Sequence, residues 1–203
     1  MTRRALLPLL LAAAVFARRA EAQEPAAPPA PEGSSPRAQA SSETPPPCPL
    51  IPTPKVYRDL GRRVTLPRAT TIVLGGKATD PEEYAAERLQ TLVARRFGNK
   101  LSIATEVDVP AGAVILLGQA DTNARLKKAL DARKVVLNEK SPGFDGFVIE
   151  IDDSGDAPAV MIGGANPRGV VYGADAFFDL LTREDSKVTF PLVSVRDWPS
   201  IPW

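Results

Sequence analysis

The stretch Ala159–Leu181 has the sequence AVMIGGANPRGVVYGADAFFDLL, which sets out a strand, a glycine turn and a helix in that order. Its first four residues form a short apolar run closed by two glycines, a pattern typical of a buried strand. Asn166 can cap the helix that follows, and Pro167 suits a first helical turn. The helix carries an apolar stripe at helical spacing, made of Val170, Ala174, Phe177, Phe178 and Leu181. We therefore expect a strand followed directly by a helix that packs on the sheet.

Strands are predicted on both sides of this unit. Phe147–Ile151 is a β-branched, apolar run, and the acidic turn Asp152–Asp156 follows it, so it should pair with the strand at Ala159 as a hairpin. A final strand is expected at about Val188–Val195. Gly173 inside the helix costs about 1 kcal/mol relative to alanine. Close approach of a neighbouring backbone would offset that cost.

A second helix is predicted upstream, from Asp80 to the residue before Gly98. Asp80 can cap it, Pro81 suits the first turn, and Glu83 takes the capping-box position. Gly98 can supply the left-handed stop. A charged first turn followed by an apolar stripe indicates an amphipathic helix that lies on a core.

Shorter elements fill the rest of the chain. A third helix is predicted to begin near Asp121 or Thr122 and to turn Leu126 and Leu130 inward. Three further strands are expected at Thr71–Leu74, Leu101–Thr105 and Val114–Leu117. Strands interleaved with three amphipathic helices, with a hairpin among them, indicate one mixed β-sheet with helices packed on it. This pattern lies in the α/β to α+β range, and we assign the α+β class.

Composition excludes several kinds of function. The 203 residues carry a formal net charge of +1 and no histidine. The absence of histidine removes Ser-His-Asp and Cys-His nucleophile systems and His-containing zinc sites. Cys48 is the single cysteine, so no internal disulfide can form. No basic surface pattern points to nucleic acid, and a carboxylate-based mechanism is the remaining catalytic option.

The N-terminus has the features of an export signal. Two arginines precede the apolar run Ala5–Phe16, and Ala20–Ala22 fits a small-x-small cleavage site. We predict a signal peptide at residues 1–22, and its alternative is an uncleaved membrane anchor. The proline- and alanine-rich residues 23–54 are predicted to be a disordered linker. One folded domain then occupies residues 55–203.

Each candidate ligand site in the sequence also has a structural interpretation. The glycine loop before Arg168 could cradle an anion at a helix N-terminus, but it matches neither phosphate-binding fingerprint. The acidic turn Asp152–Asp156 could bind calcium, yet it lacks the EF-hand spacing. Trp198 and Trp203 could stack on sugars, or lie in an extended segment along the domain edge. No carboxylate pair suggests a cleft for glycoside hydrolysis.

Several motifs, in this order, resemble a known module: Ile51–Lys55, Gly143–Ile151, Gly163–Ala174, Phe178–Leu181 and Val195–Pro199. The module is the N-terminal, non-catalytic domain of the β-N-acetylhexosaminidases of glycoside hydrolase family 20. Family 84 N-acetylglucosaminidase and hyaluronidase-type enzymes carry a similar one. The resemblance implies an α+β domain that precedes and packs against a catalytic (β/α)8 barrel. The family's catalytic pair belongs to that barrel, so no catalytic, cofactor or metal residue is carried over to this chain.

The resemblance favours a scaffold in an exported glycoside hydrolase that acts on N-acetylhexosamine-containing glycans. The end at Trp203 falls where the barrel would begin, so we expect a truncated or partial chain. The expected partners are the barrel and N-acetylated glycans, with a membrane contact only if the signal segment stays uncleaved. The candidate interdomain residues are Arg168, Gly169, Tyr172, Gly173, Asp197 and Trp198. The alternatives are a free-standing carbohydrate-binding module of the cell envelope and, ranked last, an enzyme that uses Asp or Glu.

Overall fold

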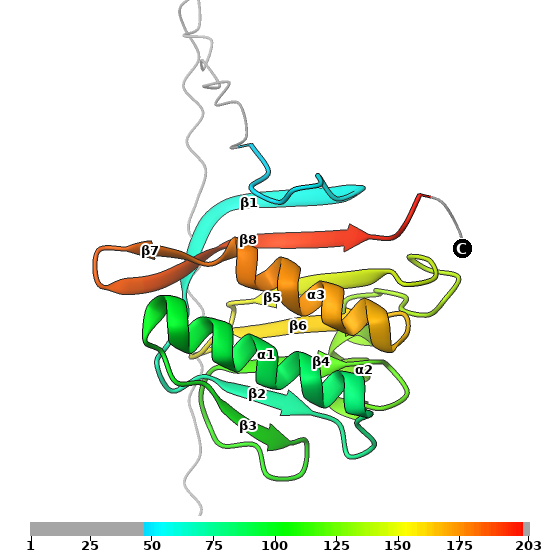
Figure 1. Cartoon of the computed structure of the whole chain (residues 1–203), viewed down its shortest axis with the longest axis horizontal. Coiled ribbons are helices and arrows are strands. Elements are labelled where there is room, and N and C mark those ends of the chain that lie inside the picture. Colours follow the sequence, from blue (N-terminus) through cyan, green and yellow to red (C-terminus); the bar gives the residue numbers. More distant parts are fainter. Residues whose placement is uncertain (1–46, 201–203) are drawn as a thin grey trace, which may run out of the picture. The chain divides into compact units, whose positions relative to one another are not determined.

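A computed structural model describes residues 47–200 of the chain (Figure 1). The predicted signal peptide and most of the predicted linker lie outside these residues. Within the described part, eight strands form one mixed sheet and three helices pack on it, which confirms the predicted α+β class. No helix in residues 47–200 combines the length and apolarity needed to cross a membrane.

The sheet has the strand order β1-β8-β5-β6-β4-β2-β3, and β7 pairs with β8. Strands β3, β2, β4 and β6 are parallel to one another, and β5, β8 and β1 continue the sheet in antiparallel fashion. The β5–β6 pair is the predicted hairpin. The strands are β1 (Val56–Thr65), β2 (Thr71–Leu74), β3 (Ser102–Thr105), β4 (Val114–Gly118), β5 (Phe147–Asp152), β6 (Ala159–Gly164), β7 (Thr182–Glu184) and β8 (Lys187–Asp197).

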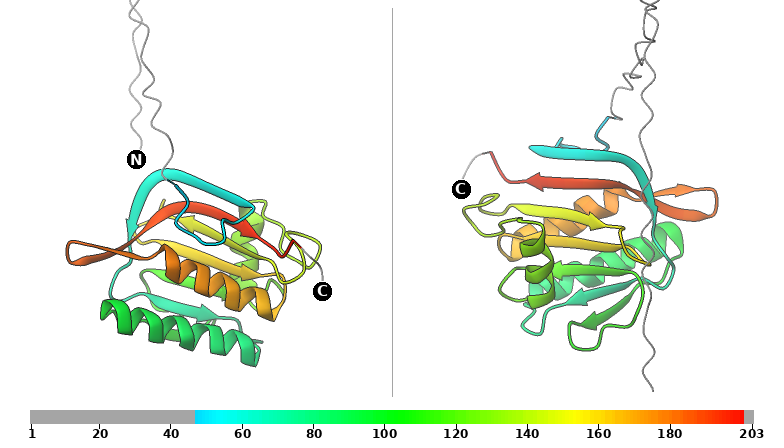
Figure 2. Two further views of the ribbon diagram at one scale, coloured as in Figure 1. Left: turned by 45° about the horizontal axis from the view of Figure 1, so that its top comes forward. Right: turned by 180° about the vertical axis from the view of Figure 1, so that it is seen from behind.

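The helices cover both faces of the sheet unequally. Helices α1 (Asp80–Phe97) and α3 (Pro167–Leu180) lie side by side on one face, and α2 (Ala124–Ala132) lies on the other (Figures 1 and 2). The larger core lies under α1 and α3, where the rings of Phe177 and Phe190 meet edge to face at 5.3 Å. A smaller core lies under α2, around Leu126, Leu130 and Met161.

Helix α1 spans the predicted residues, but its N-cap lies one residue earlier than predicted. Thr79, and not Asp80, is its N-cap, because the helix places Glu82 rather than Glu83 at the third position. One carboxylate oxygen of Glu82 accepts bonds from the Thr79 amide and hydroxyl at 2.7 and 2.9 Å. The other oxygen accepts from the Gln119 amide at 2.8 Å. This buried carboxylate therefore fastens the start of α1 to the end of β4, and the helix ends at Gly98 as predicted.

The other two helices follow the same capping logic. Asn123 caps α2, slightly later than the start predicted at Asp121 or Thr122, and its side-chain oxygen accepts from the Leu126 amide at 2.9 Å. Its amide nitrogen donates to carbonyls of β2 and β4, which holds the helix start on the sheet. Asn166 caps α3 as predicted and accepts from the Gly169 amide at 3.0 Å.

Two strands, β1 and β7, have no counterpart in the sequence predictions. Strand β1 is an outer strand, paired with β8 alone, and much of its surface is exposed. The structure also describes residues 47–54, which precede the predicted start of the folded domain at residue 55. Leu50 is 4% exposed and belongs to the larger core.

Candidate functional site

The start of α3 is joined to the loop before β5 through Asp145. This residue is buried, and its backbone has a φ of 56°, in the left-handed region. Its carboxylate accepts one bond from the Asn166 side chain and one from Arg168 Nη1, each 2.8 Å long. The Arg168 side chain is otherwise 59% exposed. Arg168 therefore anchors the loop and also presents a charged group to solvent. The sequence analysis had not identified Asp145 as a candidate residue.

The two glycines predicted for the interdomain surface are buried within the domain itself. A Cβ on Gly169 would lie 2.2 Å from the carbonyl oxygen of Gly146, and one on Gly173 would lie 2.9 Å from Ile162 Cγ2. Both positions therefore let α3 approach β5 and β6 closely, as the glycine spacing suggested. Their participation in an interdomain contact stays a prediction.

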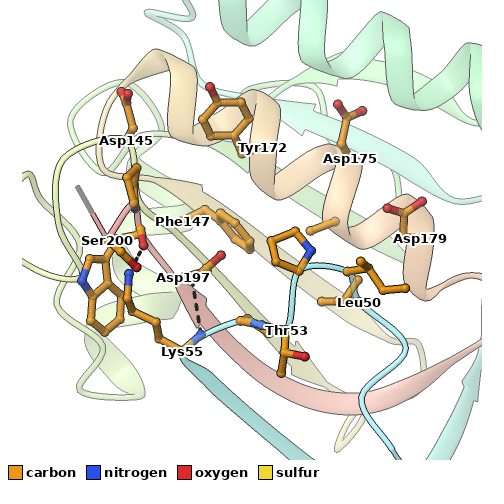
Figure 3. Close-up of a pocket in the computed structure, with 16 residues that line it drawn as sticks. Leu50, Thr53, Lys55, Asp145, Phe147, Tyr172, Asp175, Asp179, Asp197 and Ser200 are labelled. Atoms are coloured by element: carbon orange, nitrogen blue, oxygen red, sulfur yellow. Dashed lines mark hydrogen bonds between the residues drawn. The ribbon is translucent and has the colours of Figure 1, made fainter. Parts of the chain in front are cut away.

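A cleft of about 450 Å³ lies along the exposed side of α3 (Figure 3). Its walls are the segment Leu50–Lys55, helix α3, and the segment Asp197–Ser200 that follows β8. Tyr172, at 45% exposure, lies at the rim, and Phe147 lies beneath it. The structure thus brings three of the predicted interface residues to one cleft: Tyr172, Asp197 and Trp198.

Trp198 is already engaged by its own chain. The Lys55 ammonium lies 4.7 Å from the centre of its ring and donates a hydrogen bond to its carbonyl oxygen. Gly143 packs so closely that a Cβ there would lie 3.0 Å from two ring carbons. The Lys55 amide donates to Asp197 Oδ1 at 3.3 Å. These contacts tie the start of β1 to the end of β8.

Three aromatic side chains are exposed on α1, on α3 and in the loop before β5. Tyr84, Phe144 and Tyr172 are 53%, 51% and 45% exposed. Arg88 of α1 and Asp175 of α3 form an ion pair of 2.7 Å between the two helices. Exposed aromatic residues are enriched at protein interfaces.

The acidic turn, considered from sequence as a calcium site, has protein partners for two of its carboxylates. In the acidic turn, Arg133 pairs with Asp152 at 2.9 Å and Arg62 pairs with Asp153 at 2.7 Å. The hydroxyl and the amide of Ser154 both bond to Asp152 and lower the pKa of its carboxylate. Across residues 47–200, no group of three or more side chains is arranged to hold a metal ion.

Comparison with known proteins identifies the domain. The model of glycosyl hydrolase family 20, domain 2, matches residues 47–198, which is well over half of the chain. The chain belongs to this family. No curated protein matches it.

Solved structures share the fold of this family 20 domain. The chitobiase FjGH20 of Flavobacterium johnsoniae is 16% identical with a TM-score of 0.54, and the match covers 76% of this chain and 21% of that one. The structure of CpGH84D is 13% identical with a TM-score of 0.52, and covers 73% of this chain and 23% of that one. The family 20 domain therefore spans about a fifth of the length of these relatives.

Within the family 20 domain, the six predicted interface residues fall into three groups. Tyr172, Asp197 and Trp198 line the cleft, Arg168 lies at the start of α3, and the two glycines are internal. Sequence analysis missed Asp145, Phe144 and Lys55, which hold or border the same surface. The glycines that flank Phe144–Asp145 were the available signal, because a short loop between glycines often makes a close backbone contact.

Proposed function

We propose that this chain is the non-catalytic N-terminal scaffold domain of an exported glycoside hydrolase that acts on N-acetylhexosamine-containing glycans. The observation that carries the proposal is the family 20 domain 2 match, which spans almost all of the described residues. In this proposal, bond cleavage belongs to a (β/α)8 barrel that follows in the polypeptide. The domain described above supplies a folded body on which the barrel packs.

The proposed docking surface is the outer side of α1 and α3. Its support is the group of exposed aromatics Tyr84, Phe144 and Tyr172, together with the place where the chain leaves β8. Trp198 follows β8 and lines the same cleft as Tyr172, so a domain joined there starts next to this surface. Aromatic rings with polar ends suit such a contact, because they bury apolar area and keep a hydrogen-bonding group at the rim.

The first test is an activity assay of the purified chain on an aryl N-acetyl-β-glucosaminide. The scaffold role predicts no turnover above the blank, and genuine turnover by a homogeneous preparation contradicts it. The coding sequence downstream of residue 203 provides the second test. It should encode the barrel, and its absence would speak against the proposal.

The docking surface is tested in the extended polypeptide that contains both domains. Tyr172→Glu should lower the thermal stability of the two-domain protein and leave that of the isolated chain unchanged. Leu60→Glu is the matched control, because Leu60 is 62% exposed on β1, away from α1 and α3. Equal losses in the isolated chain and the two-domain protein would exclude this surface as the contact.

A carbohydrate-binding role predicts a different outcome in titration calorimetry. Chitin and peptidoglycan fragments should release heat on binding to such a module and none on mixing with a scaffold. The contacts of Trp198 with Lys55 and Gly143 favour the scaffold, because they occupy ring surface that a sugar would need. Export is tested by N-terminal sequencing of the mature protein, which should begin at Gln23.

A further inference from the structure

The carboxyl ends of β2 and β4 meet at a topological switch point in the parallel part of the sheet. The two strands are parallel neighbours, and the helices that follow them lie on opposite faces of the sheet, α1 on one and α2 on the other (Figure 2). Open α/β sheets generally bind their ligands outside the carboxyl ends of the strands at such a point. Helix N-termini converge there and attract anions. The switch point between β2 and β4 is therefore where the fold favours an anionic group.

The protein itself fills the interior of this switch point. Gly75, after β2, packs so closely against the start of α2 that a Cβ there would lie 1.9 Å from the Thr122 carbonyl oxygen. The completely buried Glu82 carboxylate accepts from the Thr122 hydroxyl at 2.5 Å and from the Gln119 amide at 2.8 Å. The turns after β2 and β4 are therefore in direct contact, and a carboxylate of the chain already satisfies donors between them.

A second carboxylate, that of the partly exposed Glu106, lies at the outside of the same switch point. Its Oε1 accepts from the Gly76 amide at 3.0 Å, and its Oε2 accepts from the Arg125 amide at 3.1 Å. Gly76 lies in the turn after β2 and Arg125 in the first turn of α2, so the two donors belong to different elements. In the described part of the chain, no basic side chain forms an ion pair with this carboxylate. Backbone amides therefore hold Glu106.

The surroundings of Glu106 are those of an anion site with its ligand bound. Helix α2 has no acidic residue in its own first turn, so Glu106 supplies the negative charge that stabilises the start of a helix. The hydrogen bond from the Gly76 amide is the main cause that lowers the pKa of Glu106, and burial acts in the opposite direction. The amides thus favour the charged form of the carboxyl group, as an anion site requires.

We propose that the amides of Gly76 and Arg125 form a binding site for a small carboxylate, and that Glu106 occupies this site as an internal ligand. In the wild-type chain the site is closed to external anions. Removing the carboxylate of residue 106 opens the site to a free carboxylate such as acetate, which can offer one oxygen to each amide. The proposal does not depend on the scaffold role, and the site lies outside the proposed docking surface.

The test uses the full chain with Glu106→Ala and compares sodium acetate with sodium chloride at equal ionic strength. The substitution should lower the melting temperature by about 2–4 °C, which is the shift that a small loss of stability produces in a domain of this size. Acetate should raise the melting temperature again by about 1–2 °C in a saturable way, as a ligand that binds only the folded state does. Chloride should not, because a monatomic ion cannot offer one oxygen to each amide. In NMR titrations, acetate should move the Gly76 and Arg125 amide signals with the same saturation.

Two further variants serve as controls. Asp108→Ala removes an exposed carboxylate from the same loop that bonds to neither amide, so it should respond equally to acetate and chloride. Glu106→Gln keeps a side chain of the same length at the site, so it should bind acetate more weakly than Glu106→Ala. Equal acetate binding by the two Glu106 variants would show that residue 106 does not fill the site. Equal responses of Glu106→Ala and Asp108→Ala to acetate would also overturn the proposal.

Discussion

Replacing Gly169 by alanine would test how closely α3 must approach the loop before β5. The new Cβ would lie 2.2 Å from the carbonyl oxygen of Gly146, about 1 Å nearer than atoms can pack. The obstacle is backbone, and that carbonyl also accepts a bond of 2.8 Å from the Ala165 amide. Overpacking costs about 1–3 kcal/mol, and weakening the bond adds about 1 kcal/mol. Better helix propensity returns up to about 1 kcal/mol, so the expected loss is about 1–3 kcal/mol.

Urea unfolding of the isolated chain measures this loss. With a slope of about 2 kcal/mol per molar, the urea midpoint for Gly169→Ala should fall by about 0.5 to 1.5 M. Gly155→Ala is the control, because its Cβ would meet nothing nearer than 3.9 Å, and its midpoint should stay unchanged. Gly173→Ala should fall between them, since its obstacle is the Ile162 side chain. If Gly169→Ala were as stable as the control, the internal packing role would be refuted.

Three further predictions concern other contacts. Backbone amides of Gly76 and α2 bond to Glu106 and lower its pKa below the usual 4.5, so its stabilising effect is present above that pH and lost as acidity increases. Unfolding curves of wild type and Glu106→Gln should therefore differ at pH 7, and the difference should shrink as the pH falls below 4.5. Asp145→Ala should cost about 3 kcal/mol in urea unfolding, because it leaves buried donors unpaired, and a loss below 1 kcal/mol would contradict this. Trp198→Ala should speed amide hydrogen exchange at Lys55 and Val56, and Trp198→Phe should keep the wild-type exchange rates. Equal exchange rates in the two variants would show that the ring of residue 198 does not hold the start of β1 on β8.

The elements that sequence analysis located share a strong local signal. The strand Thr71–Leu74 is a short β-branched run, and α3 has a cap, a proline at its first turn and an apolar stripe. Such signals depend only on residues within a few positions of one another. For this reason, the start of α3 was predicted correctly, and the caps of α1 and α2 were predicted within one or two residues.

Strand β1 was missed because it lacks that local signal. It is an outer strand that carries Arg58, Asp59, Arg62 and Arg63, and charges on an outer strand discourage pairing with other molecules. Its assignment depends on pairing with β8, more than a hundred positions away in the chain. The parallel order of β3, β2, β4 and β6 also depends on pairing between residues far apart in the chain, so no local pattern predicts it.

The candidate site was predictable only in part. Arg168, Tyr172 and Trp198 were identified through a motif resemblance and not through contacts. Asp145 was missed because the glycines beside it indicate a tight loop but do not show whether its carboxylate is buried or solvated. The tethering of Trp198 by Lys55 joins residues from the two ends of the fold, which no local pattern can reveal.

The pairing of Val56 with Arg196, together with the Lys55–Trp198 contact, places both ends of the fold at one point on its surface. A domain whose two ends are adjacent can be inserted into a loop of another protein without separating the residues that flank the insertion. A short glycine-serine bridge could likewise close the ring, and the solvent-facing turn around Gly155 offers a place to reopen it. Evolution could thus move this unit between enzymes as a self-contained cassette.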